Sequence, residues 1–268
     1  MSEPLPPDIA AALDGAGDRL GRCGRPVYFF SDLGSTNDMA GTLAEHGAPE
    51  GATVIASAQS SGRGRMGRAW FSPPGAGLYL SVICRDPRAA SFLTLAGGVA
   101  VAEGITAATG LPVQIKWPND VVVEGVGRGR WRKLAGILAE ASSTSDGLQH
   151  VILGVGINLR PAAYPRDIAD RATSIETELG RAPDRAAVLV ETLIALGGWV
   201  CELSRGASQP LVERWRALAP SARGAWVEWD TPHGPAAGTT AGIAADGALL
   251  VRTGDGIERI ISGELRWT

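Results

Sequence analysis

The stretch GRGRMGRAW, residues 62–70, places three arginines among three glycines and ends on an aromatic side chain. Glycine lets the backbone bend freely and approach a ligand closely. Arginine carries a permanent charge and a fork of donors that suits carboxylate and phosphate oxygens. Residues 53–58 (TVIASA) before it read as a short buried strand, and residues 71–75 (FSPPG) after it cannot continue as a helix. We therefore predict a flexible cationic loop that leaves a strand end and closes over an anionic ligand.

The glycine spacing of this loop also matches the G-x-G-x-x-G pattern of dinucleotide-binding folds. That pattern requires a helix to open at the third glycine, with the pyrophosphate at its N-terminus. Here the chain runs into Ser72-Pro73-Pro74, so we reject a dinucleotide site. The sequence also lacks the G-x-x-x-x-G-K-[S/T] phosphate loop. On its own the arginine loop is equally compatible with a solvated turn, and the rest of the chain has to decide.

The composition is that of an ordinary globular protein, with 268 residues, 45% hydrophobic and 20% charged. A net charge of −3 argues against a general nucleic-acid binder. We find no apolar run of about 18 residues and no signal-peptide pattern, so we expect no membrane span and a cytoplasmic location. Cys23, Cys84 and Cys201 are odd in number and far apart, which favours reduced core thiols over disulfides or a metal site.

The predicted elements indicate an α+β protein with a mixed sheet followed by a small β domain. Asp184 is a good N-cap for a long helix, and Asp246-Gly247 predicts a hairpin turn between two of four short strands near the C-terminus. Strands are expected at residues 27–30, 53–58, 78–84, 113–116, 121–124, 133–141, 151–158, 225–229, 238–243, 248–252 and 257–261. Helices are expected at residues 8–13, 39–46, 91–109, 184–203 and 209–218.

The arginine loop is part of an ordered set of five polar or glycine-rich segments. They are Ser35-Thr36-Asn37, residues 59–68 with the loop arginines, KWPND at 116–120, KLAGIL at 133–138 and GVGIN at 154–158. In this order and at these separations the segments resemble the biotin protein ligases. The resemblance runs from about Val27 to the C-terminus and includes Gly263-Glu264-Leu265. The arginine loop alone is a weak signal, KWPND is a strong one, and the ordered set is very strong.

The resemblance implies a two-step reaction with ATP, biotin and Mg²⁺. The carboxylate of biotin attacks the α-phosphate of ATP, which gives biotinyl-5'-AMP and pyrophosphate, and a lysine of a carrier domain then displaces AMP. It also implies a fold of the biotin/lipoate ligase type. The expected division is a short N-terminal lead at residues 1–26, a catalytic domain at 27–220 that binds biotin and ATP, and an SH3-like β-barrel at 221–268.

The resemblance also assigns residues. Lys133 and Arg65 are the expected catalytic residues, and Asp120 is a candidate magnesium ligand. The ureido ring of biotin offers one acceptor and two donors, which hydroxyl and amide side chains can match. The expected biotin-binding residues are Ser35, Thr36, Asn37, Gln59, Arg63, Gly64, Arg65, Trp70, Lys133 and Gly136. The expected ATP- or adenylate-binding residues are Arg63, Arg65, Arg68, Lys116, Asn119, Lys133 and Asn158.

Structural alternatives stand beside these roles. The segment Ser35-Thr36-Asn37-Asp38 reads more readily as a cap of the helix at residues 39–46. Lys133 could be a solvated charge in a basic turn with Arg128, Arg130 and Arg132. Lys116 could pair with a carboxylate at a strand end, Trp117 belongs more naturally to the core, and Asn158 could serve a turn. The hairpin at residues 125–132 is longer and more basic than a minimal version, so its tip is a candidate contact for the carrier or the nucleotide.

Two rival functions remain open. A lipoate ligase would share the fold and the two-step logic but needs no polar partners for a ureido ring. A nucleic-acid-binding module would use the two Arg-Gly loops. We expect biotin carboxyl carrier domains of acyl-CoA and pyruvate carboxylases as partners, with no DNA and no membrane. The chain lacks the winged helix-turn-helix of family members that also repress transcription, so it resembles the enzyme-only class. Monomer and weak homodimer are both open.

Overall fold

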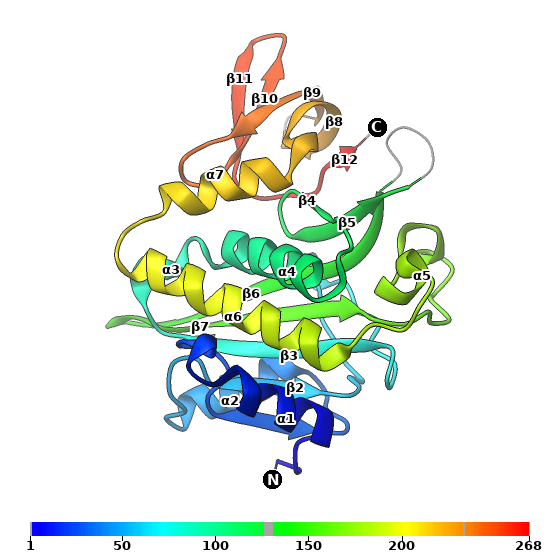
Figure 1. Ribbon diagram of the computed structural model, residues 1–268. Coiled ribbons are helices and arrows are strands. Elements are labelled where there is room, and N and C mark those ends of the chain that lie inside the picture. Colours follow the sequence, from blue (N-terminus) through cyan, green and yellow to red (C-terminus); the bar gives the residue numbers. More distant parts are fainter. Residues whose placement is uncertain (1, 126–130, 233, 268) are drawn as a thin grey trace.

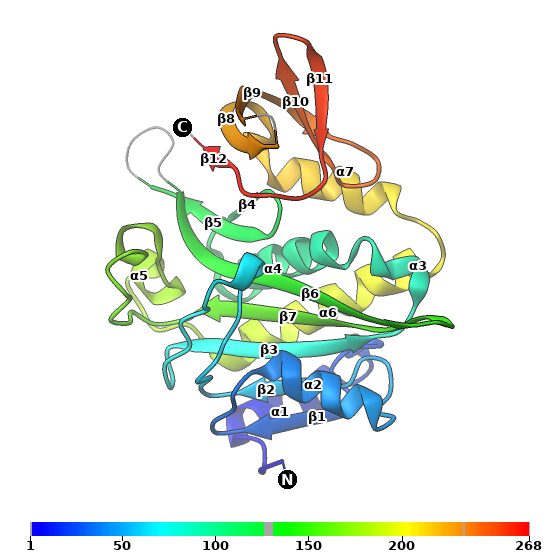
Figure 2. The ribbon, with the colours of Figure 1, turned by 180° about the vertical axis from the view of Figure 1, so that it is seen from behind.

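The structure is a computed structural model that describes residues 2–125, 131–232 and 234–267 (Figure 1 and Figure 2). Within these residues the larger sheet has seven strands in the order β1-β2-β3-β7-β6-β5-β4. β1 and β2 are parallel, and all other neighbours are antiparallel. The strands are β1 Val27–Phe30, β2 Thr53–Ala56, β3 Gly77–Cys84, β4 Gln114–Lys116, β5 Asp120–Glu124, β6 Trp131–Thr144 and β7 Gly147–Asn158.

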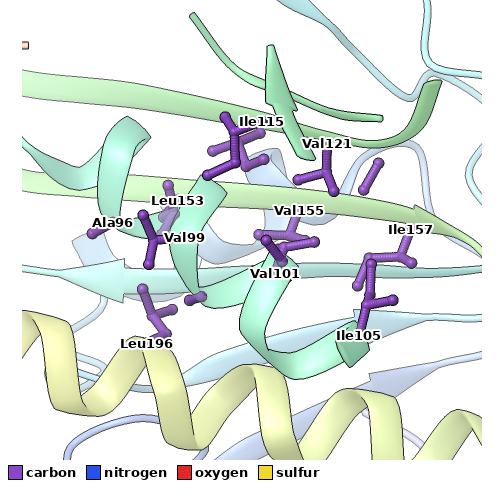
Figure 3. Close-up of a cluster of buried hydrophobic side chains, with 14 of the residues drawn as sticks. Ala96, Val99, Val101, Ile105, Ile115, Val121, Leu153, Val155, Ile157 and Leu196 are labelled. Atoms are coloured by element: carbon purple, nitrogen blue, oxygen red, sulfur yellow. The ribbon is translucent and has the colours of Figure 1, made fainter. Parts of the chain in front are cut away.

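One face of this sheet is covered by the two long helices, α4 (Leu93–Thr109) and α6 (Arg185–Ser204) (Figure 1). Apolar side chains from α4, α6 and the strands interdigitate there, among them Val99, Leu153 and Leu196, all at most 1% exposed (Figure 3). Burial of this apolar surface is the main stabilising contribution to the fold. Short helices flank this layer, namely α3 (Pro87–Ala90), α5 (Ile175–Leu179) and the 3₁₀ turns η1 (Gly17–Leu20) and η3 (Ala169–Arg171).

Helix α1 (Pro7–Ala16) belongs to the same core, since Ile9 and Leu13 are buried in it. The opposite face of the sheet carries α2 (Thr36–Glu45), which packs Ala40 and Ala44 on Val54 (Figure 2). The connection from β2 to β3 also crosses this face and contains the arginine loop, with the 3₁₀ turn η2 (Arg65–Gly67). One face of the sheet therefore holds the core, and the other is left for shorter segments.

Helix α6 begins as predicted, because the Asp184 carboxylate accepts hydrogen bonds from the backbone N–H groups of Ala186 and Ala187. By length and composition alone this helix could cross a membrane, whereas the sequence was expected to contain no such segment. In the structure 56% of its most apolar 18-residue window is buried inside the protein. Its buried apolar residues belong to the main hydrophobic core, and the helix lies beside α4 (Figure 1), so here it is a core helix.

The C-terminal residues form a second sheet of five antiparallel strands within the described part of the chain, ordered β11-β10-β9-β8-β12. Helix α7 (Gln209–Leu218) and the turn η4 (Pro220–Ala222) lead into it. Trp117 donates its indole N–H to the backbone oxygen of Gly247, and this bond ties the second sheet to the KWPND turn. The strands are β8 Arg223–Thr231, β9 Gly234–Ile243, β10 Leu249–Thr253, β11 Gly256–Ile260 and β12 Arg266–Trp267.

The expected α+β architecture with a small C-terminal β domain is confirmed. Strand β12 was not predicted, because two residues are too few to show a period. Ser35 occupies the N-cap position of α2, as the helix-cap interpretation expects, but its side chain makes no capping hydrogen bond there. Of the predicted basic hairpin at 125–132, residues 126–130 lie outside the described part of the chain.

Candidate active site

The main cavity lies on the face of the large sheet that carries the arginine loop and has a volume of about 310 Å³. Every residue that the resemblance assigned to the site, from Ser35 to Asn158, lines it. These residues come from α2, the arginine loop, the KWPND turn and strands β6 and β7. The volume is within the range of small-molecule sites. The topology therefore gathers in one place segments that lie more than 100 residues apart in the chain.

Strands β6 and β7 form the floor of the cavity, and glycines keep that floor flat. Gly136 and Gly156 are paired neighbours on these strands, and the Trp70 ring lies across both. A Cβ added at Gly136 would come within 2.9 Å of the Trp70 ring, and one at Gly156 would collide with its indole nitrogen. Gly154, one step along the face, leaves room for the Asn37 amide in the same way. Glycine is required here because side chains from outside the sheet pack on its backbone.

Lys133 points into the cavity because the pairing of β5 with β6 contains a bulge. Val121 pairs with Ala135 and Val122 with Lys133, so Leu134 is an extra residue. Leu134 and Ala135 are consequently both fully buried in the core. In a regular strand Lys133 would share the face of Ala135 and point into that core. The extra residue turns Lys133 to the same face as Gly136.

The Lys133 ammonium group lies between an aromatic ring and a carboxylate. Its Nζ is 5.1 Å from the centroid of the Trp70 ring and 2.6 Å from Oδ1 of Asp120. Asp120 begins β5 and pairs with Gly136 of the cavity floor, and the Trp70 ring lies over the same glycine. Lys133 is thus placed by contacts and is not a solvated charge in a basic turn.

A polar network lies at the end of the cavity near α2. The Thr36 backbone N–H donates to Oε1 of Gln59 at 2.8 Å, and the Gln59 amide donates to the Ser72 hydroxyl at 2.9 Å. The Ser81 hydroxyl oxygen lies 2.6 Å from Oδ1 of Asn37 and 2.8 Å from Oγ1 of Thr36. An amide oxygen only accepts, so Ser81 donates to Asn37. The Thr36 hydroxyl donates its own proton to Oε1 of Gln59 at 3.1 Å.

The three arginines of the loop have different partners. Arg63 forms a two-pronged ion pair with Asp38 and also contacts Glu140. Arg65 donates to Oδ1 of Asn119 at 3.3 Å, and burial lowers the pKa of its guanidinium from the ordinary value, an effect that Asp120 opposes. Arg68 forms an ion pair with Glu264 of the C-terminal segment. The loop is therefore tied at several points to the surrounding elements.

The KWPND turn joins β4 to β5 at the rim of the cavity. Trp117 is 4% exposed, as expected for a core residue. Among the residues that the structure describes, Lys116 forms no ion pair with a carboxylate; its Nζ lies 5.5 Å from the centroid of the Trp267 ring. Burial lowers the pKa of the Lys116 ammonium, although Asp120 partly opposes this. The Asn119 amide donates to the backbone oxygen of Ile137 at 2.8 Å, which fixes the turn against β6.

Asn158 holds a segment whose place in the site was not predicted. Its amide donates to the backbone oxygen of Thr173 at 2.9 Å, and the Tyr164 hydroxyl donates to the same oxygen. Tyr164, Ile168 and Arg171 line the cavity beside Lys133. Residues 160–172 are irregular and contain prolines, so no periodicity marked them in the sequence. The C-terminal residues Glu264 and Trp267 also line the cavity, and only the resemblance had drawn attention to Glu264.

Comparisons with known proteins match this arrangement. The model of the biotin/lipoate A/B protein ligase family matches residues 32–158, and that of the biotin protein ligase C-terminal domain matches residues 227–265. A biotin--[acetyl-CoA-carboxylase] ligase of Paracoccus denitrificans is 33% identical over 86% of this chain and 96% of its own. The chain belongs to the biotin protein ligase family. The bifunctional ligase/repressor BirA of Bacillus subtilis is 34% identical over 90% of this chain and 74% of its own length.

A solved structure of the family carries both small substrates. The biotin protein ligase of Aquifex aeolicus, in complex with biotin and ATP, superposes with a TM-score of 0.77 at 28% identity. The match covers 91% of this chain and 99% of that one. The large sheet and the C-terminal sheet are thus parts of one shared fold.

The charges around the cavity suit an anionic ligand. Its described lining contains six cations, namely Arg63, Arg65, Arg68, Lys116, Lys133 and Arg171, but only two carboxylates, Asp120 and Glu264. Both carboxylates already form ion pairs with cations of the lining. Among the residues that the structure describes, no group of three or more His, Cys, Asp or Glu side chains could hold a metal ion. The cavity therefore has an excess of positive charge.

Proposed function

We propose that this protein activates biotin with ATP to biotinyl-5'-AMP and transfers the biotinyl group to a lysine of a biotin carboxyl carrier domain. The observation that carries the proposal is the floor of the cavity. There Lys133 and Trp70 lie over paired glycines, with the arginine loop above them. The family membership and the Aquifex aeolicus ligase with biotin and ATP support the same substrates.

In the first step a carboxylate oxygen of biotin bonds to the α-phosphorus of ATP, and the bond to the pyrophosphate oxygen breaks. Carboxylate and triphosphate repel each other, so the site has to hold them in line and stabilise the developing charge. We assign this role to Lys133 and Arg65. Lys133 is presented by the β6 bulge, and Arg65 is half-buried beside Asn119 with a neutral partner. Arg68 adds charge at the rim.

We assign the biotin end to the glycine floor and the polar network beside α2. Trp70 and Gly136 would form the apolar wall for the rings and the valeryl chain. Ser35, Thr36, Asn37 and Gln59 would surround the ureido ring, and all four line the cavity. Thr36 donates directly to Gln59, Gln59 donates to Ser72, and Ser81 donates to Asn37. A site whose hydroxyls and amides are fixed in advance favours a ligand that can satisfy them.

We assign the nucleotide end to Lys116, Asn119 and Asn158, beside the C-terminal segment. Asn119 and Asn158 also have structural bonds, to Ile137 and Thr173, so part of their effect would be to position neighbouring backbone. Mg²⁺ usually binds proteins through one or two carboxylates while phosphates supply further oxygens. Asp120 fits that pattern as the carboxylate on the cavity floor. Bound there, the ion would neutralise charge on the pyrophosphate leaving group.

In the second step the carrier lysine nitrogen bonds to the acyl carbon of the adenylate, AMP leaves with the bonding electrons, and the amine loses a proton. We propose carrier domains of acyl-CoA or pyruvate carboxylases as acceptors. The names of the Paracoccus denitrificans and Mycobacterium tuberculosis relatives, both biotin--[acetyl-CoA-carboxylase] ligases, support this class. The net charge of −3 gives no support to DNA as a partner.

We also propose the division into a lead at 1–26, a catalytic domain at 27–220 and a β-barrel at 221–268, and a cytoplasmic location. The sheet boundary at Arg223 supports the second division. The three cysteines are unpaired in the structure, as is usual in a reducing compartment. We propose a monomer or weak homodimer that needs no membrane.

The transfer reaction tests the proposal. Purified protein with ATP, Mg²⁺, biotin and a carrier domain should add one biotinyl group to the carrier, as measured by intact mass. A carrier whose acceptor lysine is replaced by arginine should stay unmodified. Lipoate offered in place of biotin should give little product, because it cannot satisfy the polar network around Thr36 and Gln59. Efficient lipoylation would instead favour the lipoate ligase reading.

A further inference from the structure

Arg63 is held by two carboxylates, whereas the other arginines of the loop are not. Its Nη1 donates to Oδ2 of Asp38 at 2.7 Å and its Nη2 to Oδ1 at 2.6 Å. The same Nη2 lies 3.1 Å from Oε2 of Glu140. Asp38 belongs to α2 and Glu140 to β6. Arg63 therefore connects the base of the arginine loop to two separate elements.

Glu140 is shared between the loop and the wall of the cavity. Its Oε2 also accepts a hydrogen bond from Nδ2 of Asn37 at 2.5 Å. A carboxylate only accepts, so the nitrogen of the Asn37 amide has to face Glu140 and its oxygen has to face Ser81. Asn37 and Arg63 line the cavity, but Asp38 and Glu140 do not. The two carboxylates lie behind the wall and act on residues that face the ligand.

The charges also separate Arg63 from its neighbours. One guanidinium faces two carboxylates, so the cluster of Arg63, Asp38 and Glu140 has no positive charge to spare. The Arg63 guanidinium holds the pKa of the Asp38 carboxyl below its usual value, and this keeps the pair ionised. Arg65, in contrast, contacts the neutral amide of Asn119. Of these two arginines, Arg65 is the one whose charge is available to an anionic substrate.

We propose that Asp38 and Glu140 are positioning residues that make Arg63 the anchor of the arginine loop. Glu140 couples this anchor to the biotin end of the cavity through Asn37. Arg63 then stabilises the loop and does not neutralise the phosphate, which revises the nucleotide-binding role expected for it from the sequence. This inference rests on the proposed function, because its consequences are expressed through biotin and its adenylate.

The anchor predicts how the loop behaves in the reaction. The base of the loop stays attached to α2 and β6, while the tip around Arg65 and Met66 moves over the bound adenylate. A closed loop keeps water and the reactive intermediate apart. Without the anchor the loop opens more often, and biotinyl-5'-AMP escapes before a carrier arrives. The first chemical step needs only transient closure and is affected less.

Single substitutions distinguish the anchor from a direct phosphate contact. Asp38→Asn, Glu140→Gln and Arg63→Met should each speed the release of biotinyl-5'-AMP about tenfold, equivalent to about 1.4 kcal/mol, measured by filtration of single-turnover mixtures. The KM for ATP in pyrophosphate exchange should stay within about twofold of the unmodified protein. Glu140→Gln should in addition raise the KM for biotin, because it replaces the charged acceptor of the Asn37 amide with a neutral one and weakens that hydrogen bond. Asp38→Asn should leave the KM for biotin unchanged, because the Asp38 carboxylate contacts Arg63, whereas Asn37 is bound by Glu140.

Asp8→Asn is the matched control. Asp8 forms a similar two-pronged ion pair with Arg185, at 2.7 and 2.8 Å, far from the cavity. Asp8→Asn should leave the rate of adenylate release and the KM values for ATP and biotin unchanged. The side chain of Asp38 is 62% exposed, so Asp38→Asn is not expected to impair folding, and its circular dichroism should match that of the unmodified protein.

The opposite pattern would overturn the proposal. If Arg63 binds phosphate directly, Arg63→Met raises the KM for ATP, while Asp38→Asn and Glu140→Gln free the guanidinium and leave adenylate release unchanged or slower. Failure of the proposed function has a different signature, because the unmodified protein itself would then show no exchange with biotin.

Discussion

Lys133 shows how a single residue of the strand decides the chemistry of the site. The extra residue at Leu134 turns Lys133 from the core face of β6 to the cavity face. Trp70 and Asp120 then hold its ammonium group over the glycine floor. KLAGIL was recognised in the sequence by its resemblance to the family. The bulge itself was not predictable, because nothing in the residue types shows where two strands lose register.

Replacement of Lys133 by alanine should slow adenylation strongly and have little effect on folding. We expect Lys133→Ala to slow biotin-dependent pyrophosphate exchange by at least about 100-fold, the order seen when a charge-stabilising group is removed. Loss of the partly exposed ion pair with Asp120 should lower the free energy of unfolding by no more than about 1 kcal/mol. Urea unfolding measures the second quantity. Arg132→Ala, which removes the neighbouring cation and its contact with Glu178, is the control and should retain exchange.

Lys116 should make stability depend on pH at the alkaline end. Burial lowers the pKa of its ammonium below the usual lysine value of 10.5. Between the folded and the unfolded pKa the unfolded chain binds more protons, so this group makes stability rise with pH in that window. Below the pKa of Lys116 in the folded state, the buried ammonium lowers the free energy of unfolding by its full and constant amount.

We therefore expect Lys116→Met to be more stable than the unmodified protein at neutral pH, with a difference that shrinks as the pH approaches 10.5. Urea unfolding at a series of pH values measures this. A variant that is equally stable at every pH would show that burial of the ammonium is not costly. The same variant should raise the KM for ATP, since Lys116 lines the cavity.

At the scale of the element, the arginine loop combines a fixed base with a strained tip. Met66 adopts a left-handed backbone conformation with φ of 56° and has 72% of its surface exposed. A side chain in this conformation costs about 1–2 kcal/mol, and few contacts offset that cost at the tip. The sequence predicted a loop from its glycines and prolines, but it did not show the partners that tether Arg63 and Arg68.

Hydrogen exchange should resolve the two parts of the loop. Without ligand, amides at residues 65–67 should exchange quickly, and those at 62–64 more slowly, since Gly64 donates to the backbone oxygen of Arg68 and Arg63 is anchored. Biotinyl-5'-AMP should slow exchange at 65–67. Slow exchange at the tip in the absence of ligand would contradict the idea of a closing loop.

Other elements differ in how well they could be predicted from the sequence. Helix α6 was predicted almost to the residue, because Asp184 caps it and its apolar residues recur at helical spacing. The wall formed by residues 160–173 was not predicted, because it is held by bonds to residues distant in the sequence, among them Asn158 to the Thr173 oxygen and the Thr173 N–H to the Lys133 oxygen. Ser81 and Glu140 were also missed. Both are ordinary residues of regular strands, and only pairing across the sheet brings them to Asn37.

At the scale of the whole molecule, the C-terminal sheet completes the nucleotide end of the cavity. Two side chains bond to it: Trp117 donates to the backbone oxygen of Gly247, and Arg216 donates through two nitrogens to the backbone oxygen of Ile243. A third contact joins Arg68 to Glu264 across the cavity mouth. The small β domain was predictable from its short strands and its turn, but its position over the cavity was not.

Trp117→Phe tests whether this junction matters. The change keeps most of the buried ring but leaves the oxygen of Gly247 without its donor, so we expect a loss of about 1–3 kcal/mol in urea unfolding. It should also raise the KM for ATP, because Glu264 and Trp267 would be displaced. Trp199→Phe removes a comparable bond to Glu103 within the helical layer. That control should lose stability but leave the KM for ATP unchanged.

Pyrophosphate exchange into ATP, catalysed by the purified protein without any carrier, tests the central claim most directly. The cavity is predicted to support exchange with biotin and Mg²⁺, no exchange without an acid substrate, and little with lipoate. Exchange with lipoate alone would keep the fold and the first step but overturn the substrate. No exchange with either acid, from protein shown to be folded, would contradict the assignment of the cavity as a site for acid activation.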